Sequence, residues 1–449
     1  IGCVNAPLNY RLSGGEIALL IDQSKPKALI YDAEFEKIIS EALRSVHHRP
    51  EIIIMADLNN EMDAPEGVVT YRDFVKDGSP ENPVRKDKPS IYDETTRFFT
   101  SGTTNLPKAV PVNDINEVLS AHDVIMHFPL SPKDVTMNLT PWFHRGGLHS
   151  GGPCPTLYIG GTMVILRDFT PRLALQYVSL YHITFLIGAP TVIDMLCRIQ
   201  ETNPRDISSL HGIVLMGSPL DKEPCKRYMK VLTTNIFNGY GTTETFWNVF
   251  LRPYDLPDKA GYAGGACTDD DVRVVRVDTT KHVSPDELVP MDKETVGEVV
   301  IFAPNKSTFA YYDNPKTTEE KFHNGWLYTG DLATWDEHAY ITIIGRKDDM
   351  IVSAGENIYP VQVESILNEH PKVAESLVFG IPDPKRGSVI AALIRPSDPS
   401  LTEKEMKQFC MNHPMLAPYK RPRIFRFVKE LPHNATGKLL HKLPPDFKF

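Results

Sequence analysis

FFTSGTTNLPKA, residues 98–109, is the stretch from which the rest of the sequence can be interpreted. It places four small hydroxyl side chains around one glycine, and Lys108 follows them. Backbone N–H groups, hydroxyl donors and an ammonium group in one loop can bind the oxygens of a phosphate chain. The loop is not a Walker loop, because Pro107 and Ala109 replace the second glycine and the Ser/Thr of that motif. It therefore indicates a phosphate loop of another kind, with an ordinary polar surface turn as the alternative.

Composition limits the class of protein. The chain has 449 residues, of which 41% are hydrophobic and 23% are charged, so it can bury a large core. Its length suggests about two to four domains. Its net charge of −9 disfavours a nucleic-acid partner, since such binding needs a basic surface. Six scattered cysteines without a C-x-x-C pair favour reduced thiols in a cytoplasmic protein. We find no apolar run of the ~18–20 residues that a membrane helix needs.

Helix and strand signals alternate along the chain. A capping box at Ser13 and Glu16 predicts a helix before a buried strand at 28–31. Short apolar runs at 212–216 and 235–237 end in loops, which predicts parallel α/β sheets. Ligands gather at the carboxyl ends of such strands. We therefore expect a ligand site in the loop after Phe237, which carries residues 240–244.

A boundary is predicted at residues 346–352. After it come a helix that opens at Pro360, a helical segment at 400–411 and apolar runs at 376–381, 389–394 and 424–428. About 100 residues with their own helices and strands predict a small α/β domain.

Six motifs in one order connect these segments. They are residues 100–108, Pro141-Trp142-Phe143-His144, Tyr240-Gly241-Thr242-Thr243-Glu244, Tyr328-Thr329-Gly330-Asp331, residues 345–349 leading into 353–357, and Asn434-Ala435-Thr436-Gly437-Lys438. Together they span almost the whole chain, and the sequence resembles the acyl-adenylate-forming superfamily. That family includes acyl-CoA synthetases, adenylation domains of peptide synthetases, and luciferases.

The resemblance implies an α/β fold in two parts. A large N-terminal domain (1–346) of parallel and mixed sheets sandwiched by helices would bind ATP and the acyl group. A small mobile C-terminal lid domain (347–449) would rotate about a hinge at Asp348. Because Ile1 resembles mid-domain sequence, we also expect an N-terminal segment of the large domain to be missing.

The chemistry requires a carboxylate oxygen to attack the α-phosphorus of ATP, although both partners are anions. Such a site must neutralise charge, align the attack and exclude water. Glu244 is the candidate Mg²⁺ ligand, since Mg²⁺ binds one or two protein carboxylates together with phosphate oxygens. The resemblance implies that Thr243 donates to the α-phosphate and that Tyr240 stacks on adenine. A solvated loop acid is the ordinary alternative for Glu244.

The resemblance assigns further nucleotide contacts. Asp331 would accept hydrogen bonds from both ribose hydroxyls, with help from Arg346, although an Asp after Gly is often only a turn residue. The β- and γ-phosphates would be held by Thr100, Ser101, Gly102, Thr103, Thr104 and Lys108. The nucleotide pocket would also include Gly217, Ser218, Pro219, Asn238, Gly239, Gly241 and Thr242. Asn105 and Ala109 stand where the commonest family form has glycines, which leaves the loop's detailed shape open.

Three more residues would act in catalysis or in the second half-reaction. Lys438 would be the catalytic lysine of adenylation, bridging the attacking carboxylate and the α-phosphate. A lysine in a basic tail is the alternative. His144 would gate the acyl pocket from the thiol tunnel, although a His among aromatics is often packed core. Gly355 would leave room for a pantetheine arm.

The leading interpretation is an AMP-forming acyl-CoA synthetase, with ATP, Mg²⁺ and coenzyme A as cofactors. A small carboxylic acid is the expected partner, with no nucleic acid, no transmembrane segment and a homodimer as the assembly to test. The main alternative is a stand-alone adenylation enzyme that loads a separate carrier protein, and a luciferase-like oxygenase is a third. A covalent nucleotidyl transferase would need a Lys-x-Asp-Gly site, and residues 76–78 lack its spacer. A non-catalytic nucleotide-binding module is the remaining rival.

The acid is not identified by the sequence. Phe246 and Trp247 favour an aromatic or medium-chain acid. Arg145 is either a receptor for a second carboxylate or a surface arginine.

Overall fold

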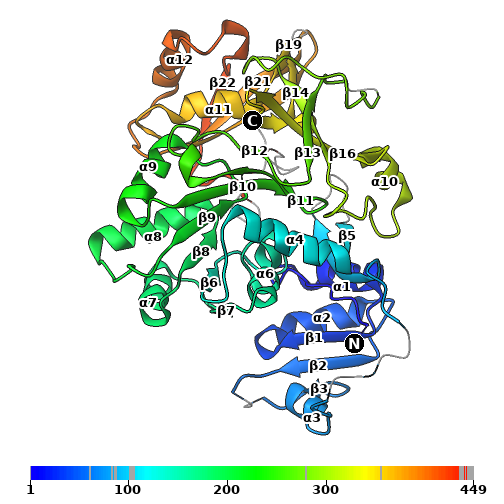
Figure 1. Cartoon of the computed structure of the whole chain (residues 1–449). Coiled ribbons are helices and arrows are strands. Elements are labelled where there is room, and N and C mark those ends of the chain that lie inside the picture. Colours follow the sequence, from blue (N-terminus) through cyan, green and yellow to red (C-terminus); the bar gives the residue numbers. More distant parts are fainter. Residues whose placement is uncertain are drawn as a thin grey trace.

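The computed structural model describes residues 2–59, 62–81, 84, 88–100, 107–278, 281–353, 356–433, 439 and 441. These residues form a large part, built from several sheets with helices packed on them, and a smaller α/β lobe at the C-terminal end (Figure 1). The expected α/β architecture is therefore present.

The N-terminal unit is a small parallel sheet covered by two helices. Its elements are α1 (Gly14–Ser24), β1 (Ala28–Asp32), η1 (Ala33–Phe35), α2 (Glu36–Ser45), β2 (Ile52–Ala56), β3 (Val69–Thr70) and α3 (Tyr71–Val75). The predicted capping box is confirmed, because Ser13 N donates to Glu16 Oε2 at 2.8 Å and Glu16 N donates to Ser13 Oγ. This cap fixes where the first helix begins.

The central sheet has seven strands in the order β12-β11-β10-β9-β8-β6-β7. They are β6 (Val135–Asn138), β7 (Thr162–Met163), β8 (Phe185–Gly188), β9 (Gly212–Met216), β10 (Ile236–Thr242), β11 (Phe246–Leu251) and β12 (Gly265–Ala266). The five strands from β10 to β7 are parallel, β11 is antiparallel to β10, and β12 is antiparallel to β11. The sheet is therefore mixed, with the antiparallel strands at one edge.

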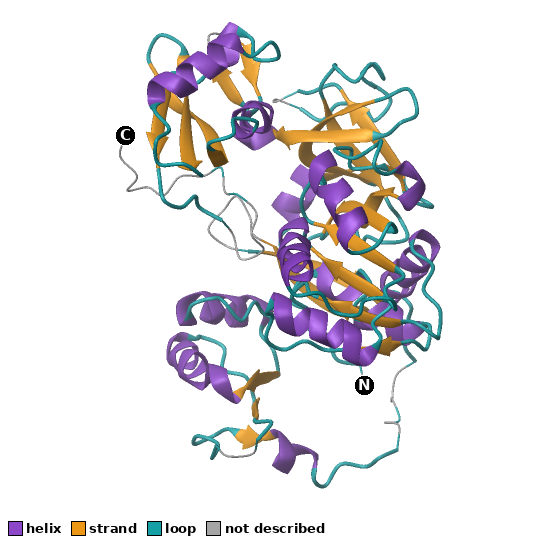
Figure 2. Cartoon of the chain, turned by 90° about the vertical axis from the view of Figure 1, so that its left-hand side faces the viewer, coloured by secondary structure: helices purple, strands orange, loops and turns teal. Residues whose placement is uncertain are grey.

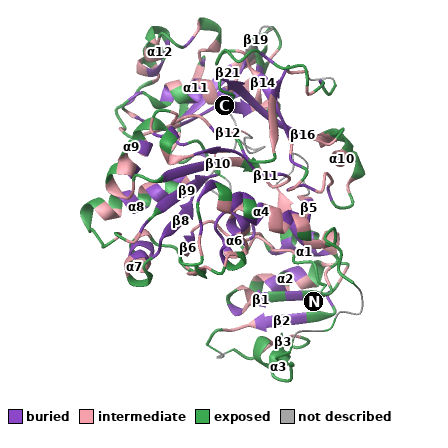
Figure 3. Cartoon of the chain, viewed as in Figure 1, coloured by how far each residue is buried: buried purple, intermediate pink, exposed green. Residues whose placement is uncertain are grey.

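Helices cover both faces of this sheet. They are α4 (Asp114–His127), α5 (Arg145–His149), α6 (Pro153–Tyr158), α7 (Pro171–Tyr181), α8 (Pro190–Thr202) and α9 (Lys222–Val231). Ile213 and Leu215 of β9 belong to the core with α7, α8 and α9, whereas Val214 and Met216 belong to the core on the α4 side. Because successive side chains of a strand point to opposite faces, this alternation places the sheet between two cores. Strands β8 and β9 are consequently buried throughout (Figure 3).

A hairpin and a third sheet complete the large part. The hairpin pairs β4 (Glu94–Thr100) with β5 (Lys108–Asn113). The third sheet contains β13 (Asp271–Val275), β14 (Gly297–Phe302), β15 (Phe322–His323), β16 (Trp326–Trp335) and β17 (Ile341–Arg346), all antiparallel to their neighbours. Helix α10 (Pro315–Lys321) precedes β15, and the short η2 (Pro253–Asp255) lies between β11 and β12 of the central sheet.

The C-terminal lobe has a core of its own. Figure 2 shows its helices and strands at the upper end of the molecule, near the C-terminus. Its elements are η3 (Lys347–Asp349), β18 (Ile351–Ser353), β19 (Glu356–Ile358), α11 (Pro360–Asn368), β20 (Val373–Asp383), β21 (Gly387–Pro396), α12 (Glu403–Asn412), η4 (Pro418–Lys420) and β22 (Ile424–Phe427). The helices and strands predicted after residue 352 are all present within a few residues of their expected bounds. No helix in the described part of the chain is long and apolar enough to cross a membrane.

One prediction about local structure is wrong. Residues 240–242 do not lie in a loop after Phe237, because β10 continues through Thr242 and pairs with β11. The register places Tyr240 opposite Val249 and Gly241 opposite Trp247, with an irregularity between Tyr240 and Gly241. Pairing with a later strand extends β10 beyond its apolar run, and only Thr243, Glu244 and Thr245 form the turn.

Candidate active site

Two side chains from two other strands bind the carboxylate of Asp331 on β16. The Tyr240 hydroxyl on β10 donates to Oδ2 at 2.5 Å, and Arg346 Nη1 on β17 donates to Oδ1 at 2.7 Å. Asp331 and Arg346 are opposite each other in the β16–β17 pair, so the sheet register brings their charges together. Tyr240 belongs to the central sheet, and this cluster therefore joins two sheets.

The protonation of the cluster follows from its burial. Burial, and then the charge of Asp331, raise the pKa of Tyr240 well above its ordinary value, so the phenol remains a donor. Burial favours a lower pKa for Arg346, but the charge and the hydrogen bond of Asp331, with smaller contributions from Asp348 and Tyr240, together outweigh it and the pKa is raised. The guanidinium group is therefore a permanent positive charge beside the carboxylate.

The predicted association of Asp331 with Arg346 is present, and the hydroxyl of Tyr240 is an additional partner that the sequence did not reveal. A carboxylate has about four lone-pair sites, and these two donors use two of them. The remaining sites can still accept hydrogen bonds from a ribose. That role for Asp331, and stacking of the Tyr240 ring on adenine, stay predictions.

Glu244 lies in the turn between β10 and β11. The Tyr311 hydroxyl donates to Glu244 Oε1 at 2.6 Å, and Lys108 Nζ lies 5.3 Å from the centre of the Tyr311 ring. Burial and then the charge of Glu244 raise the pKa of Tyr311, which keeps the phenol protonated. Within the described residues Glu244 Oε2 has no hydrogen-bond partner and is available to a cation.

Lys108 is in a cationic neighbourhood. Burial lowers its pKa most, and the positive charge of Lys321 lowers it further, while the charge of Glu244 opposes these effects. Lys108 is also the register partner of Thr100 across the β4–β5 hairpin. The structure thus brings the two predicted phosphate-binding residues at the ends of this loop opposite each other.

Arg145 is not a surface arginine. Only 2% of it is exposed, at the start of α5. Nη1 donates to the carbonyl of Thr243 at 2.8 Å, and Nη2 donates to the carbonyl of Lys306 at 2.8 Å and to Ser120 Oγ at 3.1 Å. Both terminal nitrogens therefore have acceptors in the protein, whereas Nε is buried on the cavity lining without a partner among the described residues. Arg145 anchors the turn that carries Glu244.

Glycine is required at Gly241 for a steric reason. A Cβ atom built on Gly241 would lie 1.6 Å from the carbonyl oxygen of Phe246, which no side chain can tolerate. The close approach of β10 and β11 at this point sets the geometry of the turn. The predicted nucleotide motif, residues 240–244, thus covers the end of β10 and the start of the turn to β11.

A cavity of about 910 Å³ lies against the same hairpin. Its lining includes Gly217 and Ser218 after β9, Gly239, Gly241, Thr242 and Thr243 of the hairpin, and His144. Phe246 and Trp247 also line it, with their rings 5.1 Å apart and 13° from parallel. The structure therefore brings candidate nucleotide and acyl-pocket residues to one cavity. Asn238, on β10, is buried beside it.

His144 forms part of the wall of this cavity. Its ring centre is 4.3 Å from that of Phe143. Burial, with a smaller contribution from the charge of Arg11, lowers the pKa of His144 to about 4. His144 is therefore neutral at pH 7, and its buried Nε2 has no partner among the described residues. A gating role stays a prediction.

Several predicted residues lie outside the described part of the chain. They are Ser101, Gly102, Thr103, Thr104, Gly355 and Lys438. Pro219 and Asp348 are described, in the loop after β9 and in η3 respectively.

Sequence reasoning missed a buried lysine behind the site. Lys306 is 2% exposed, and its Nζ donates to Asp123 and Asp270 at 2.8 Å and to the Trp247 carbonyl at 2.5 Å. A lysine in a polar loop gives no sign of burial. Its acceptors come from three distant segments that only the fold assembles.

Two other groups of ligand-type side chains are poor metal sites. Glu117 and Cys154 flank His149, but Glu117 is hydrogen-bonded to that histidine, and burial with the Glu117 charge raises the pKa of Cys154 to about 12. In the second group, Asp123, His127 and Cys267, the cation Lys306 already binds Asp123, and Arg252 contacts His127 Nδ1 at 2.6 Å. The role of Glu244 as a Mg²⁺ ligand stays a prediction.

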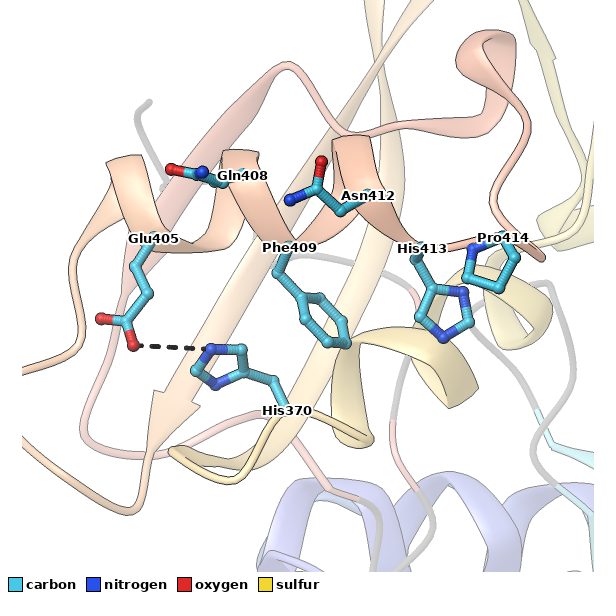
Figure 4. Close-up of a pocket in the computed structure, with 7 residues that line it drawn as sticks. All are labelled: His370, Glu405, Gln408, Phe409, Asn412, His413 and Pro414. Atoms are coloured by element: carbon cyan, nitrogen blue, oxygen red, sulfur yellow. Dashed lines mark ion pairs between the residues drawn. The ribbon is translucent and has the colours of Figure 1, made fainter.

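A second cavity, of about 410 Å³, lies on the C-terminal lobe beside α12 (Figure 4). Phe409 lines it, and His370 Nε2 lies 3.6 Å from Glu405 Oε1. None of the predicted site residues lines this cavity.

Comparison with known families gives two matches in chain order. The family described as AMP-binding enzyme matches residues 1–312, and the AMP-binding enzyme C-terminal domain matches residues 362–438.

Individual relatives match over nearly the whole chain. A feruloyl-CoA synthase from Amycolatopsis sp is 30% identical over 441 residues, which are 98% of this chain and 82% of the relative. A 2-succinylbenzoate–CoA ligase from Bacillus cereus (strain Q1) is 30% identical over 445 residues, 98% of this chain and 83% of the relative. An O-succinylbenzoate coenzyme A synthetase from Bacillus subtilis, solved with ATP and a magnesium ion, has a TM-score of 0.79 and 28% identity. That match covers 97% of this chain and 82% of the solved chain, and it agrees with the expected fold.

Proposed function

This chain belongs to the family of AMP-binding enzymes, and on that premise we propose that it is an ATP-dependent acid–CoA ligase. A carboxylic acid and ATP give an acyl-AMP and pyrophosphate, and the CoA thiol then takes the acyl group to give acyl-CoA and AMP. The relatives named as CoA ligases, which match almost the entire chain, favour CoA over a carrier protein as acceptor.

One observation carries the proposal. Residues from the central sheet, the third sheet and the β4–β5 hairpin converge on one region, with Tyr240 and Arg346 on Asp331, and Lys108 and Glu244 on Tyr311. Tyr240 and Glu244 belong to the same hairpin, so the two clusters are neighbours. A ribose-binding carboxylate beside phosphate-binding and metal-binding groups is the arrangement that adenylation requires.

The residues fit a bound Mg²⁺. Glu244 has one oxygen held by Tyr311 and the other available, which matches an ion that uses few protein carboxylates. When bound, Mg²⁺ neutralises phosphate charge. Lys108 adds a positive charge on the phosphate side, and Asp331 orients the ribose so that the α-phosphorus faces the acid. Arg145 fixes the turn against which these groups are aligned.

We propose an aromatic or medium-chain acid as substrate. The stacked Phe246 and Trp247 offer it an apolar wall, and the cavity is large enough for a ring or a short chain. Ser150 Oγ and His144 Nε2 are buried on the cavity lining and have no partner among the described residues. A substrate that carries a polar substituent would satisfy them. Feruloyl and succinylbenzoate groups in the relatives' names fit this description.

We further propose the domain division 1–346 and 347–449, with Asp348 as the hinge. Lys347 Nζ donates to Glu298 Oε2 at 2.8 Å and to the carbonyl of Asp278 at 2.6 Å. These contacts fix Lys347 to the large part, which supports a pivot immediately after it. Rotation of the C-terminal domain would then withdraw Lys438 from the site and bring Gly355 to it. The scattered cysteines support a cytoplasmic location, and a homodimer is the assembly to examine.

The decisive test is AMP release from a panel of acids with and without CoA. We expect turnover with an aromatic or medium-chain acid that depends on CoA. Pyrophosphate exchange without CoA-dependent turnover would favour carrier loading instead. Activity on acetate alone would contradict the proposed acid class, and tight ATP binding without AMP release from any acid would indicate a binding module.

A further inference from the structure

Helix α10 ends at Lys321, a lysine close to the cluster of Tyr240, Asp331 and Arg346. Lys321 is half-buried. Among the described residues its ammonium group forms no hydrogen bond or ion pair. A second cation of this region, Arg346, is paired with Asp331. A half-buried, unpaired ammonium group in a site for anions needs an explanation.

The surroundings of Gly330 show where the ammonium group of Lys321 lies. A Cβ atom built on Gly330 would lie 3.3 Å from Lys321 Nζ and 3.3 Å from Arg346 Nη2. Gly330 directly precedes Asp331 and has a φ of +75°, which glycine adopts without strain. The absence of a side chain at Gly330 therefore leaves space beside two positive charges, next to the proposed ribose ligand.

Lys108 is the third cation of this region, and Lys321 affects its protonation. Lys321 is the neighbour that, after burial, does most to lower the pKa of Lys108, and Arg346 contributes in the same direction. Lys321 is thus close to the ribose cluster and also within electrostatic reach of the phosphate-loop lysine. Like charges repel one another; Glu244 and Glu320 oppose this effect at Lys108, and an anion placed between the cations would relieve the repulsion further. A polyphosphate that extends from the ribose cluster toward Lys108 is such an anion.

We propose that Lys321 is a further substrate-binding residue, whose ammonium group contacts the β- and γ-phosphates of ATP and then the departing pyrophosphate. This rests on the proposed function. In the adenylation step the carboxylate oxygen forms a bond to the α-phosphorus, and the bond from the α-phosphorus to the bridging oxygen of the β-phosphate breaks. The electron pair of the broken bond stays on the pyrophosphate. An ammonium group at that end stabilises the charge as it develops.

The test compares two ligands that differ only in the phosphates concerned. Binding of MgATP and of AMP is measured by titration calorimetry for the wild type, Lys321→Met and Lys321→Arg. We expect Lys321→Met to weaken MgATP binding roughly 10- to 100-fold and to leave AMP binding within about twofold. Lys321→Arg keeps the charge and should retain most of the affinity. The matched control is Lys316→Met, since Lys316 is on the same helix but is exposed.

Equal loss of MgATP and AMP binding in Lys321→Met would overturn the proposal, as would no loss of either. A second measurement needs no variant. Magnesium pyrophosphate should protect Lys321, and not Lys316, from an acetylating reagent, as read by mass spectrometry, and equal labelling with and without it would overturn the proposal. Both experiments omit the acid, so their outcome is independent of whether an acid substrate is found. Failure of the acid panel alone would count against the proposed function and not against Lys321.

Discussion

Asp331 is oriented by two protein donors at once, Tyr240 and Arg346. A carboxylate held from two sides cannot rotate freely, so its remaining lone pairs keep a fixed direction for a ligand. Such preorganisation reduces the conformational entropy that the Asp331 side chain would otherwise lose on binding a ligand. If Asp331 binds the ribose as proposed, the hydroxyl of Tyr240 should contribute to nucleotide binding independently of its ring.

Replacing Tyr240 by phenylalanine removes a single oxygen atom and tests whether the hydroxyl group supports nucleotide binding by Asp331. The change removes a hydrogen bond to a charged group, which contributes ~1.5–3 kcal/mol, and keeps the ring. We expect AMP affinity measured by calorimetry to fall roughly 10-fold or more. Tyr92→Phe is the control, because Tyr92 is largely exposed. Unchanged AMP affinity in Tyr240→Phe would show that Asp331 needs no such support.

Arg145 shows where residue-level prediction fails. The motifs predicted that Asp331 and Arg346 would associate, and the strand register confirms it. The sequence left Arg145 either as a surface residue or as a ligand for a second carboxylate. Its acceptors are carbonyls 98 and 161 residues away, and no local pattern reports such partners. Charged side chains are buried when the fold supplies acceptors, and that depends on long-range structure.

At the scale of elements, strand β9 was predictable to the residue because both of its faces are buried and its run is continuously apolar. Strand β10 was predicted too short. Its second half carries glycines and polar residues, and it is extended only because β11 pairs with it. Local composition therefore located the core of the sheet, whereas its antiparallel edge required knowledge of a partner strand.

The β10–β11 hairpin gives an element-scale prediction. Gly241→Ala would force a Cβ atom against the Phe246 carbonyl, so the two strands must separate. We expect a lower melting temperature and loss of AMP binding, since Tyr240 and Glu244 flank this position. Gly15→Ala is the control, because a Cβ atom there meets nothing within 4 Å and alanine favours the helix. Wild-type AMP binding by Gly241→Ala would mean that the close approach is not needed.

The network of Lys306 gives a prediction about pH. Burial raises the pKa of Asp270 from 3.8 to about 7, although Lys306 opposes this. The unfolded chain therefore releases this proton at lower pH than the folded chain does. The stability that protonated Asp270 contributes is complete below pH 3.8 and is lost as the pH rises through about 7.

Asp270→Asn should remove that dependence. We expect the melting temperature of the variant to fall less between pH 5 and pH 8 than that of the wild type, by roughly 2–4 °C. Asp258→Asn, at an exposed carboxylate, should keep the wild-type slope. Parallel wild-type and Asp270→Asn curves would show that Asp270 does not titrate in this range.

At the scale of the whole molecule, the large part and the C-terminal lobe have separate cores, joined through η3. Lys347 is bound to the large part, while β18 and α11 contribute to the core of the lobe. A chain that is fixed on one side of residue 348 and belongs to another core on the other side is suited to rotation there. The boundary at 346–352 could be proposed from sequence, but the ion pair of Lys347 with buried Glu298 could not.

Lys438→Ala tests whether the two half-reactions use different faces of the lobe. If Lys438 acts only in adenylation, its loss should lower acyl-AMP formation from acid and ATP by ~10²–10³. Thioester formation from supplied acyl-AMP and CoA should change little, because the rotated lobe would no longer present this lysine. Both rates can be measured separately, the first as acid-dependent ATP–pyrophosphate exchange and the second as CoA thiol consumption. Lys429→Ala, at an exposed lysine of the same lobe, should affect neither. Equal loss of both half-reactions in Lys438→Ala would mean that one arrangement of the lobe serves both, which would remove the need for a hinge at Asp348.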